Sequence, residues 1–163
     1  MVNKKIVSLA VAAIVLGGVL AYQLFAPSSR APVWVLQPDN IQITSQGQKI
    51  YVEHCASCHG ENLEGQGNWR QRLASGRLPA PPHDETGHTW HHDDEALFNV
   101  TKYGPQFVAG ADYQSDMPAF EGVISDAEIV AALSFIKSTW PAKVRATHDE
   151  INNRAEITRE QMK

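Results

Sequence analysis

The chain has 163 residues, of which 43% are hydrophobic and 20% are charged, and its formal net charge at pH 7 is −4. This length accommodates one small domain together with additional segments. The acidic balance argues against nucleic acid as a partner, because proteins that bind nucleic acid carry clustered basic residues. It favours protein partners with a basic or neutral surface, which associate in a salt-sensitive way.

The N-terminus combines a basic head with a long uncharged run. Lys4 and Lys5 precede residues 6–26, which contain no charged side chain. At about 1.5 Å per residue such a helix is roughly 30 Å long, enough to cross a bilayer. We predict an uncleaved membrane anchor over residues 1–26, with a cleaved signal peptide as the alternative. Under either interpretation the rest of the chain is exported. The two lysines keep the N-terminus in the cytoplasm, so the rest of the chain is expected on the periplasmic side of a bacterial inner membrane.

A linker and a first helix follow the uncharged run. Residues 27–40 contain several prolines and serines, which is typical of a linker, and a main domain is expected over residues 41–140. The apolar spacing predicts a helix from Ile43 to His54, with Thr44 or Ser45 as its N-cap.

The motif Cys55-Ala56-Ser57-Cys58-His59 has the spacing of a c-type haem attachment site. In such a site the two thiols form thioether bonds to the haem, and the histidine is an axial ligand of the iron. The chain has only two cysteines, so a closed zinc site would need two further histidines. A thioredoxin-like redox pair would need a βαβ context, which the sequence does not show, and a plain disulfide is the remaining alternative. We therefore predict one covalent haem c.

Residues 60–92 are rich in glycine and proline and read as a long loop. A loop of this length is unusual in a compact domain, but a large buried cofactor that the loop surrounds explains it. Trp69, Arg70 and Arg72 are candidate partners of the haem propionates, and a solvated loop is the alternative for them.

Four histidines in the second half of this loop suggest a second hypothesis. His83, His88, His91 and His92 are close enough in sequence to suggest a metal site or a sixth ligand to the haem iron. The alternative is that they are exposed to solvent or hold the loop by hydrogen bonds. Because His91 and His92 are adjacent, they point in different directions on a regular element, which weakens the metal hypothesis.

A second helix is predicted from Asp93 to Tyr103, with Asp93 as its N-cap and Gly104 at its end. The loop that follows, residues 105–122, contains Met117. Of the three methionines, Met1 is on the cytoplasmic side of the predicted anchor and Met162 is in the C-terminal tail. Met117 is therefore the methionine placed to ligate the iron, although a methionine that fills a core gap is the commoner case.

The last predicted helix runs from Ser125 to Trp140. Ser125 and Glu128 form the pattern of a capping box, and an apolar stripe follows at helical spacing. Residues 141–163 are charged and poor in apolar side chains, and they are predicted to be a tail, either an exposed helix or disordered.

The segment from Gly47 through Tyr51 to Cys55–His59 and Gly60 resembles the opening of a class I cytochrome c, and Met117-Pro118 resembles the distal ligand loop of that family. The resemblance covers about residues 40–140 and implies an all-α fold of about three main helices around one covalent haem. It implies that Phe135 packs on Gly47 where the first and last helices cross. It also implies a backbone carbonyl near Pro79 or Pro81 that accepts a hydrogen bond from His59, and Met117 as the distal ligand.

These inferences predict a membrane-tethered electron carrier that is not an enzyme and has no catalytic residue. Filling both axial positions with His59 and Met117 leaves no site for a substrate, and a His/Met pair raises the reduction potential relative to two histidines. The expected partners are redox proteins of the periplasm or the membrane. The alternatives are a haem-containing subunit of a periplasmic oxidoreductase, or a metal-binding or sensing protein that uses the His83–His92 cluster.

Overall fold

The computed structural model describes residues 34–162. The predicted anchor at residues 1–26 and most of the linker at 27–40 lie outside these described residues. Among residues 34–162, none of the helices combines the length and the apolar character that a membrane span requires.

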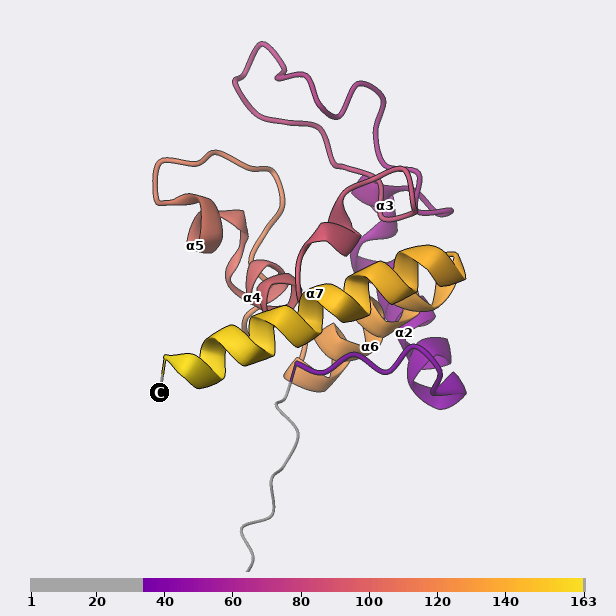
Figure 1. Ribbon diagram of the computed structural model, residues 1–163. Coiled ribbons are helices and arrows are strands. Elements are labelled where there is room, and N and C mark those ends of the chain that lie inside the picture. Colours follow the sequence, from indigo (N-terminus) through magenta and orange to yellow (C-terminus); the bar gives the residue numbers. More distant parts are fainter. Residues whose placement is uncertain (1–33, 163) are drawn as a thin grey trace, which may run out of the picture. The chain divides into compact units, whose positions relative to one another are not determined.

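The described part of the chain is helical, and residues 34–162 contain no strand. The elements in chain order are α2 (Ile41–His54), α3 (Ala56–His59), the 3-10 turn η1 (Thr89–His91), α4 (Asp94–Tyr103), α5 (Pro105–Ala109), α6 (Asp126–Thr139) and α7 (Ala142–Gln161), as seen in Figure 1. The all-α class is confirmed, and the three predicted helices correspond to α2, α4 and α6.

Side-chain caps fix where the three main helices begin. Asp93 caps α4 by accepting hydrogen bonds from two backbone N–H groups, and Ser125 forms the predicted capping box with Glu128 at the start of α6. The start of α2 differs from the prediction. Asn40, rather than Thr44 or Ser45, accepts hydrogen bonds from the first turn, so α2 begins two residues earlier than expected. Asparagine is among the strongest N-cap residues, and its position at the end of the linker explains the longer helix.

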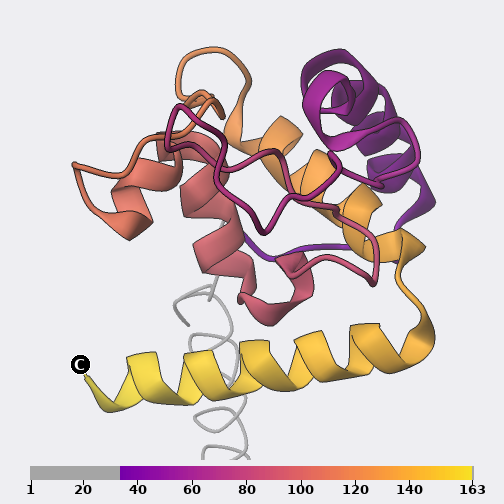
Figure 2. The same cartoon turned by 90° about the horizontal axis from the view of Figure 1, so that it is seen from above.

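The helices α2 and α6 cross in close contact, as the indigo and orange helices in Figure 2 show. Gly47 is buried at the crossing, and a Cβ atom there would overlap the backbone of Ala131. The expected contact between Gly47 and Phe135 is not among the closest contacts at this position. The atoms nearest to Gly47 belong to Ala131 and Ala132, whereas Phe135 packs against Tyr51 with ring centroids 5.6 Å apart. The glycine allows the backbone of α6 to approach α2 closely.

The C-terminal residues form the helix α7. Of the two alternatives predicted for this segment, an exposed helix or a disordered tail, the structure shows the helix. Most of α7 is exposed, but His148 is completely buried beside η1 and α4. Its Nε2 donates a hydrogen bond to the carbonyl of His92 at 2.9 Å, and its ring lies edge-on to Trp140. The helix is therefore attached to the domain through a buried polar side chain, although its composition is that of a solvated segment.

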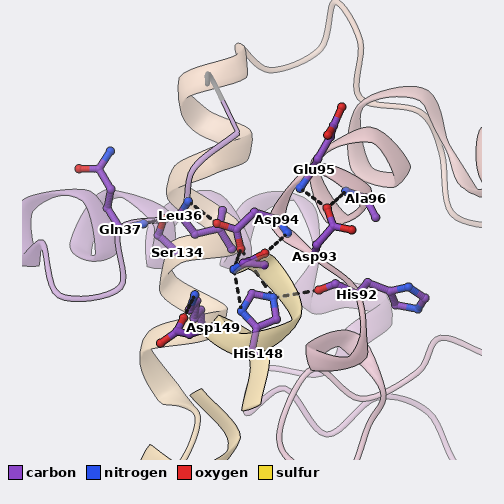
Figure 3. A network of polar contacts seen from close by, with 12 residues as sticks. Leu36, Gln37, His92, Asp93, Asp94, Glu95, Ala96, Ser134, His148 and Asp149 are labelled. Atoms are coloured by element: carbon purple, nitrogen blue, oxygen red, sulfur yellow. Dashed lines mark hydrogen bonds and ion pairs between the residues drawn. The ribbon is translucent and has the colours of Figure 1, made fainter. Parts of the chain in front are cut away.

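Asp94 joins three segments of the chain at this place, as Figure 3 shows. Its carboxylate accepts a hydrogen bond from the backbone N–H of Leu36 and another from the side-chain amide of Asn152, each at 2.9 Å. Next to it, the Nζ of Lys137 on α6 lies 2.6 Å from the carboxylate of Asp149 on α7. The start of the described chain, α4, α6 and α7 are thus held together by one group of polar contacts.

The crossing gives a first prediction. We expect Gly47→Ala to lower the free energy of unfolding by about 1–3 kcal/mol, because the added methyl group overlaps the α6 backbone in a well-packed interface. Denaturant unfolding of the haem-loaded protein, followed by its helical circular dichroism, measures the change. Gly67→Ala is the matched control, since a Cβ atom at Gly67 meets no atom within 4 Å. Equal stability of the two variants would contradict the prediction.

The buried histidine gives a second prediction, for pH dependence. Burial lowers the pKa of His148, and Lys137 lowers it further, against smaller opposing effects of Asp94, the His92 carbonyl and Asp149. As the pH falls below about 6.5, the unfolded chain binds a proton at this site before the folded chain does, so the free energy of unfolding decreases.

We therefore expect His148→Gln to lose less stability than the unsubstituted protein between about pH 7.5 and about pH 5.5. Denaturant unfolding at the two pH values measures this, and His91→Gln, at an exposed position, is the control. If His148→Gln shows the same pH dependence as the unsubstituted protein, His148 does not cause it.

Candidate haem site

The cysteine motif lies at the bend between α2 and α3. Cys55 ends α2 and begins α3, and His59 is the last residue of α3. Both thiols are free; Cys55 is half-buried and Cys58 is exposed. Burial and the neighbouring Cys58 raise the pKa of the Cys55 thiol to about 11. A thiol–disulfide exchange site needs a lowered thiol pKa, so this environment argues against the thioredoxin-like alternative.

The imidazole of His59 is buried, and a backbone carbonyl fixes its orientation. Its Nδ1 donates a hydrogen bond to the carbonyl of Pro81 at 2.8 Å, since a carbonyl only accepts. The proton is therefore on Nδ1, and Nε2 keeps a lone pair that a metal can use. Of the two prolines singled out in the sequence, Pro81 makes this contact. Pro79 is buried two residues earlier and makes no hydrogen bond to His59.

Backbone hydrogen bonds hold the loop around His59. The N–H of Gly65 donates to the carbonyl of His59, and the N–H of His83 donates to the carbonyl of Leu63, each at 2.7 Å. The hydroxyl of Tyr51, on α2, donates to the carbonyl of Gly60 at 2.7 Å. Residues 60–83 therefore fold back on α3, so that Pro81 lies beside His59 although the two residues are far apart in sequence.

His83 stacks on His59, with ring centroids 4.0 Å apart and an interplanar angle of 23°. Its Nδ1 lies 2.7 Å from the hydroxyl of Thr89, and its carbonyl accepts a hydrogen bond from the indole of Trp140. Burial lowers the pKa of His83 well below the usual range, so the ring is neutral at pH 7. Because the two rings are stacked side by side, His83 would lie on the same side of a bound haem as His59.

The other three histidines are exposed, and the ring of His88 lies edge-on to that of His92 with centroids 5.2 Å apart. His88 stacks on Trp69, and His91 stacks on Trp90 with ring centroids 3.7 Å apart. Within residues 34–162, no three His, Cys, Asp or Glu side chains are arranged to hold a metal ion. The structure thus gives no support to the second metal site suggested by the sequence. The same finding applies to Cys55, Cys58 and His59, which do not form a zinc site with one another.

The three candidate propionate partners have contacts within the loop or across it. The guanidinium of Arg70 lies 4.0 Å from the ring centroid of Trp69, and Arg72 donates a hydrogen bond to the carbonyl of Gly76 at 2.6 Å. Arg72 also lies 6.0 Å from the ring of Tyr113, in the loop that contains Met117.

Arg77, which had no predicted role, connects two loops. Its Nη1 pairs with Asp116 at 2.5 Å, and its Nε is the one buried side-chain nitrogen or oxygen among residues 34–162 that has no hydrogen-bond partner. No local sequence signal marks this residue, because its partner is 39 positions away in another loop.

Met117 is half-buried in the loop between α5 and α6. Its backbone N–H donates a hydrogen bond to the hydroxyl of Ser115 at 3.1 Å. The end of this loop is attached to α4, because the N–H groups of Phe120 and Glu121 donate to the carbonyls of Thr101 and Lys102. The thioether is therefore in a loop with fixed ends, distinct from the loop that holds His59.

The residues present fit a haem better than an isolated metal ion. Two free thiols next to an imidazole whose Nε2 is available match the chemistry of covalent haem attachment. A bare metal site would need further ligands, which the described residues do not bring together.

A comparison with protein families found a match over residues 42–136 to the family described as cytochrome c oxidase, cbb3-type, subunit III. No curated protein and no solved structure matched the chain. The matched range includes α2, the cysteine motif, both loops and most of α6, and it ends before α7. Because the match covers more than half of the sequence, the chain belongs to this family of class I monohaem c-type cytochrome domains, and it binds one covalent haem c.

Proposed function

We propose that this protein is a membrane-tethered, single-haem electron carrier in which Cys55 and Cys58 attach the haem and His59 and Met117 are the axial ligands. Haem-based electron transfer is the function of its family, and domains of this family are typically exported. The tether, the ligand pair and the identity of the redox partners are the proposed part.

The observation that carries the proposal is the hydrogen bond from His59 to Pro81. When bound, haem c supplies an iron that gains or loses one electron. The protein's contribution is to keep the Nδ1 proton of His59 on the carbonyl side, so that Nε2 is free for the iron. Met117 is the one methionine of the described loops and supplies a thioether from a second, separately anchored segment. With both axial positions filled, the site is suited to electron transfer rather than to substrate binding.

A second candidate function comes from the family description, which names an oxidase subunit. In that case the haem passes electrons within a membrane complex instead of between separate proteins. Purification in mild detergent distinguishes the two. A carrier purifies alone, whereas a subunit purifies with other haem proteins and with oxygen consumption driven by an electron donor.

The ligand assignment gives a third prediction. We expect Met117→Ala to keep covalent haem but to lose the Met-to-iron charge-transfer band and to bind carbon monoxide in the reduced state. The reduction potential should fall by on the order of 0.1 V, which is part of the roughly 0.8 V range that axial ligands span. Met162→Ala, at an exposed C-terminal position, is the matched control and should change neither property. An unchanged spectrum in Met117→Ala would exclude Met117 as the ligand.

The tether gives a fourth prediction. We expect the full chain to stay with the inner-membrane fraction after a high-salt or alkaline wash, because a span of residues 6–26 is held by the apolar core of the bilayer. Replacing residues 1–26 by a cleavable signal peptide should release the haem protein into the periplasm with an unchanged spectrum. Release of the unaltered chain without a wash would favour the cleaved alternative.

A further inference from the structure

His83 lies directly against His59, the proposed proximal ligand. The two rings are stacked, with centroids 4.0 Å apart and an interplanar angle of 23°. They come from different segments, because His59 is the last residue of α3 and His83 is in the loop that precedes η1. The proposed function assigns no role to His83. The contact nevertheless places a second planar ring where it acts on the ligand itself.

The hydrogen bond to Pro81 fixes only one edge of the His59 imidazole. It joins Nδ1 to the carbonyl oxygen at 2.8 Å and determines the direction in which that edge points. A carbonyl oxygen accepts hydrogen bonds over a broad range of directions, so this contact alone allows the ring to tilt. A flat ring packed against one face limits the tilt, because tilting brings atoms of the two rings into overlap. His83 supplies that face.

His83 is itself held from four directions. Its backbone N–H donates a hydrogen bond to the carbonyl of Leu63, and its carbonyl accepts one from the indole of Trp140, each at 2.7 Å. The ring of Tyr51, on α2, lies edge-on to the His83 ring with centroids 6.2 Å apart. The Nδ1 of His83 lies 2.7 Å from the hydroxyl of Thr89, on η1. Both the backbone and the ring of His83 are therefore fixed by neighbouring elements.

The contact with Thr89 explains why a histidine suits this position. An aliphatic side chain would fill the same space, but it would have neither a flat face nor a polar atom to fix its rotation. Thr89 is buried, and its hydroxyl also lies 3.5 Å from the carbonyl of Pro82. A threonine hydroxyl donates and accepts, so it can accept the bond from Nδ1 of His83 and donate one to Pro82. Thr89 thus determines the plane of the His83 ring.

From these contacts we propose that His83 is a positioning residue that sets the plane of the His59 imidazole, and that Thr89 sets the plane of His83. The inference rests on the proposed function, since it assumes that His59 ligates the haem iron. Groups that contact a metal ligand orient it and thereby tune the metal. The plane of an axial imidazole determines which iron d orbitals it overlaps, and therefore how unpaired spin is distributed over an oxidised haem.

The test measures the ring plane of His59 in the oxidised, full-length, haem-loaded protein. His83→Leu removes the flat ring and its hydrogen bond, and Thr89→Val removes the hydrogen bond alone. Proton NMR resolves the four haem methyl groups, and the order and spread of their shifts depend on the plane of the axial imidazole. We expect both variants to change this pattern, with the larger change in His83→Leu. A role in stability alone would lower the free energy of unfolding and leave the pattern unchanged.

Two further threonine variants serve as controls. Thr101→Val is the matched control for Thr89→Val, because the hydroxyl of Thr101 donates to the carbonyl of Leu97 within α4. It should leave the haem methyl pattern unchanged. Thr89→Ser keeps the hydroxyl and should retain the pattern of the unsubstituted protein.

Hydrogen exchange gives a second measurement. The Nδ1 proton of His59 exchanges with solvent when its bond to Pro81 opens. We expect about tenfold faster exchange in His83→Leu, because a stacked aromatic pair contributes up to about a factor of ten to such an opening equilibrium. Thr101→Val should exchange at the rate of the unsubstituted protein.

The outcomes distinguish failure of this inference from failure of the proposed function. If the unsubstituted protein shows no resonances of an iron-bound imidazole, His59 is not a ligand and the proposed function itself is wrong. If these resonances are present and His83→Leu keeps the methyl pattern and the exchange rate, the positioning role of His83 is wrong. Covalent haem content and helical circular dichroism show which variants have folded. If His83→Leu takes up no haem, Thr89→Val decides alone, and an unchanged methyl pattern there overturns the inference.

Discussion

The hydrogen bond between His59 and Pro81 is the contact on which the proximal side of the site depends. It determines which nitrogen of the imidazole carries the proton, and therefore which nitrogen is available to iron. The carbonyl can do this only because the loop returns to α3, through the bonds of Gly65 and His83 to the chain near His59. His83 then covers one face of the imidazole as a neutral ring, so that His59 has little freedom to rotate.

The helices behind the loop hold this arrangement in place. Tyr51 on α2 contacts the carbonyl of Gly60, and Trp140 at the end of α6 contacts the carbonyl of His83. The close crossing at Gly47 determines the distance between α2 and α6, and so the distance between these two anchor points. The packing of α2 against α6 therefore holds the loop in a fixed position, although the loop has almost no secondary structure of its own.

The features predicted from residue patterns are those that depend on neighbouring residues, whereas the bond from His59 to the Pro81 carbonyl was implied by the family resemblance. Each of these features lies within a short stretch of the sequence, so its pattern can be recognised there. They are the haem motif, the caps at Asp93 and Ser125, and the apolar stripe of α6. Two of the features that were missed join distant positions. Arg77 and Asp116 are 39 positions apart, and His148 reaches a carbonyl 56 positions away, so neither partner leaves a signal near the other. The charged composition of α7 indicated a solvated segment, because one buried histidine has little effect on an average.

The two sides of the candidate site differ in how they are held. On the proximal side, a buried histidine, a carbonyl and several backbone hydrogen bonds lie within one continuous segment, with helices packed behind it. On the distal side, Met117 is in a loop whose closest side-chain connection across to the first loop is the exposed pair of Arg77 and Asp116. Exposed pairs are weak and are screened by salt, whereas buried hydrogen bonds are not. In the proposed arrangement, exchange of an axial ligand therefore begins at Met117 rather than at His59, because the loop of Met117 is held by fewer buried contacts.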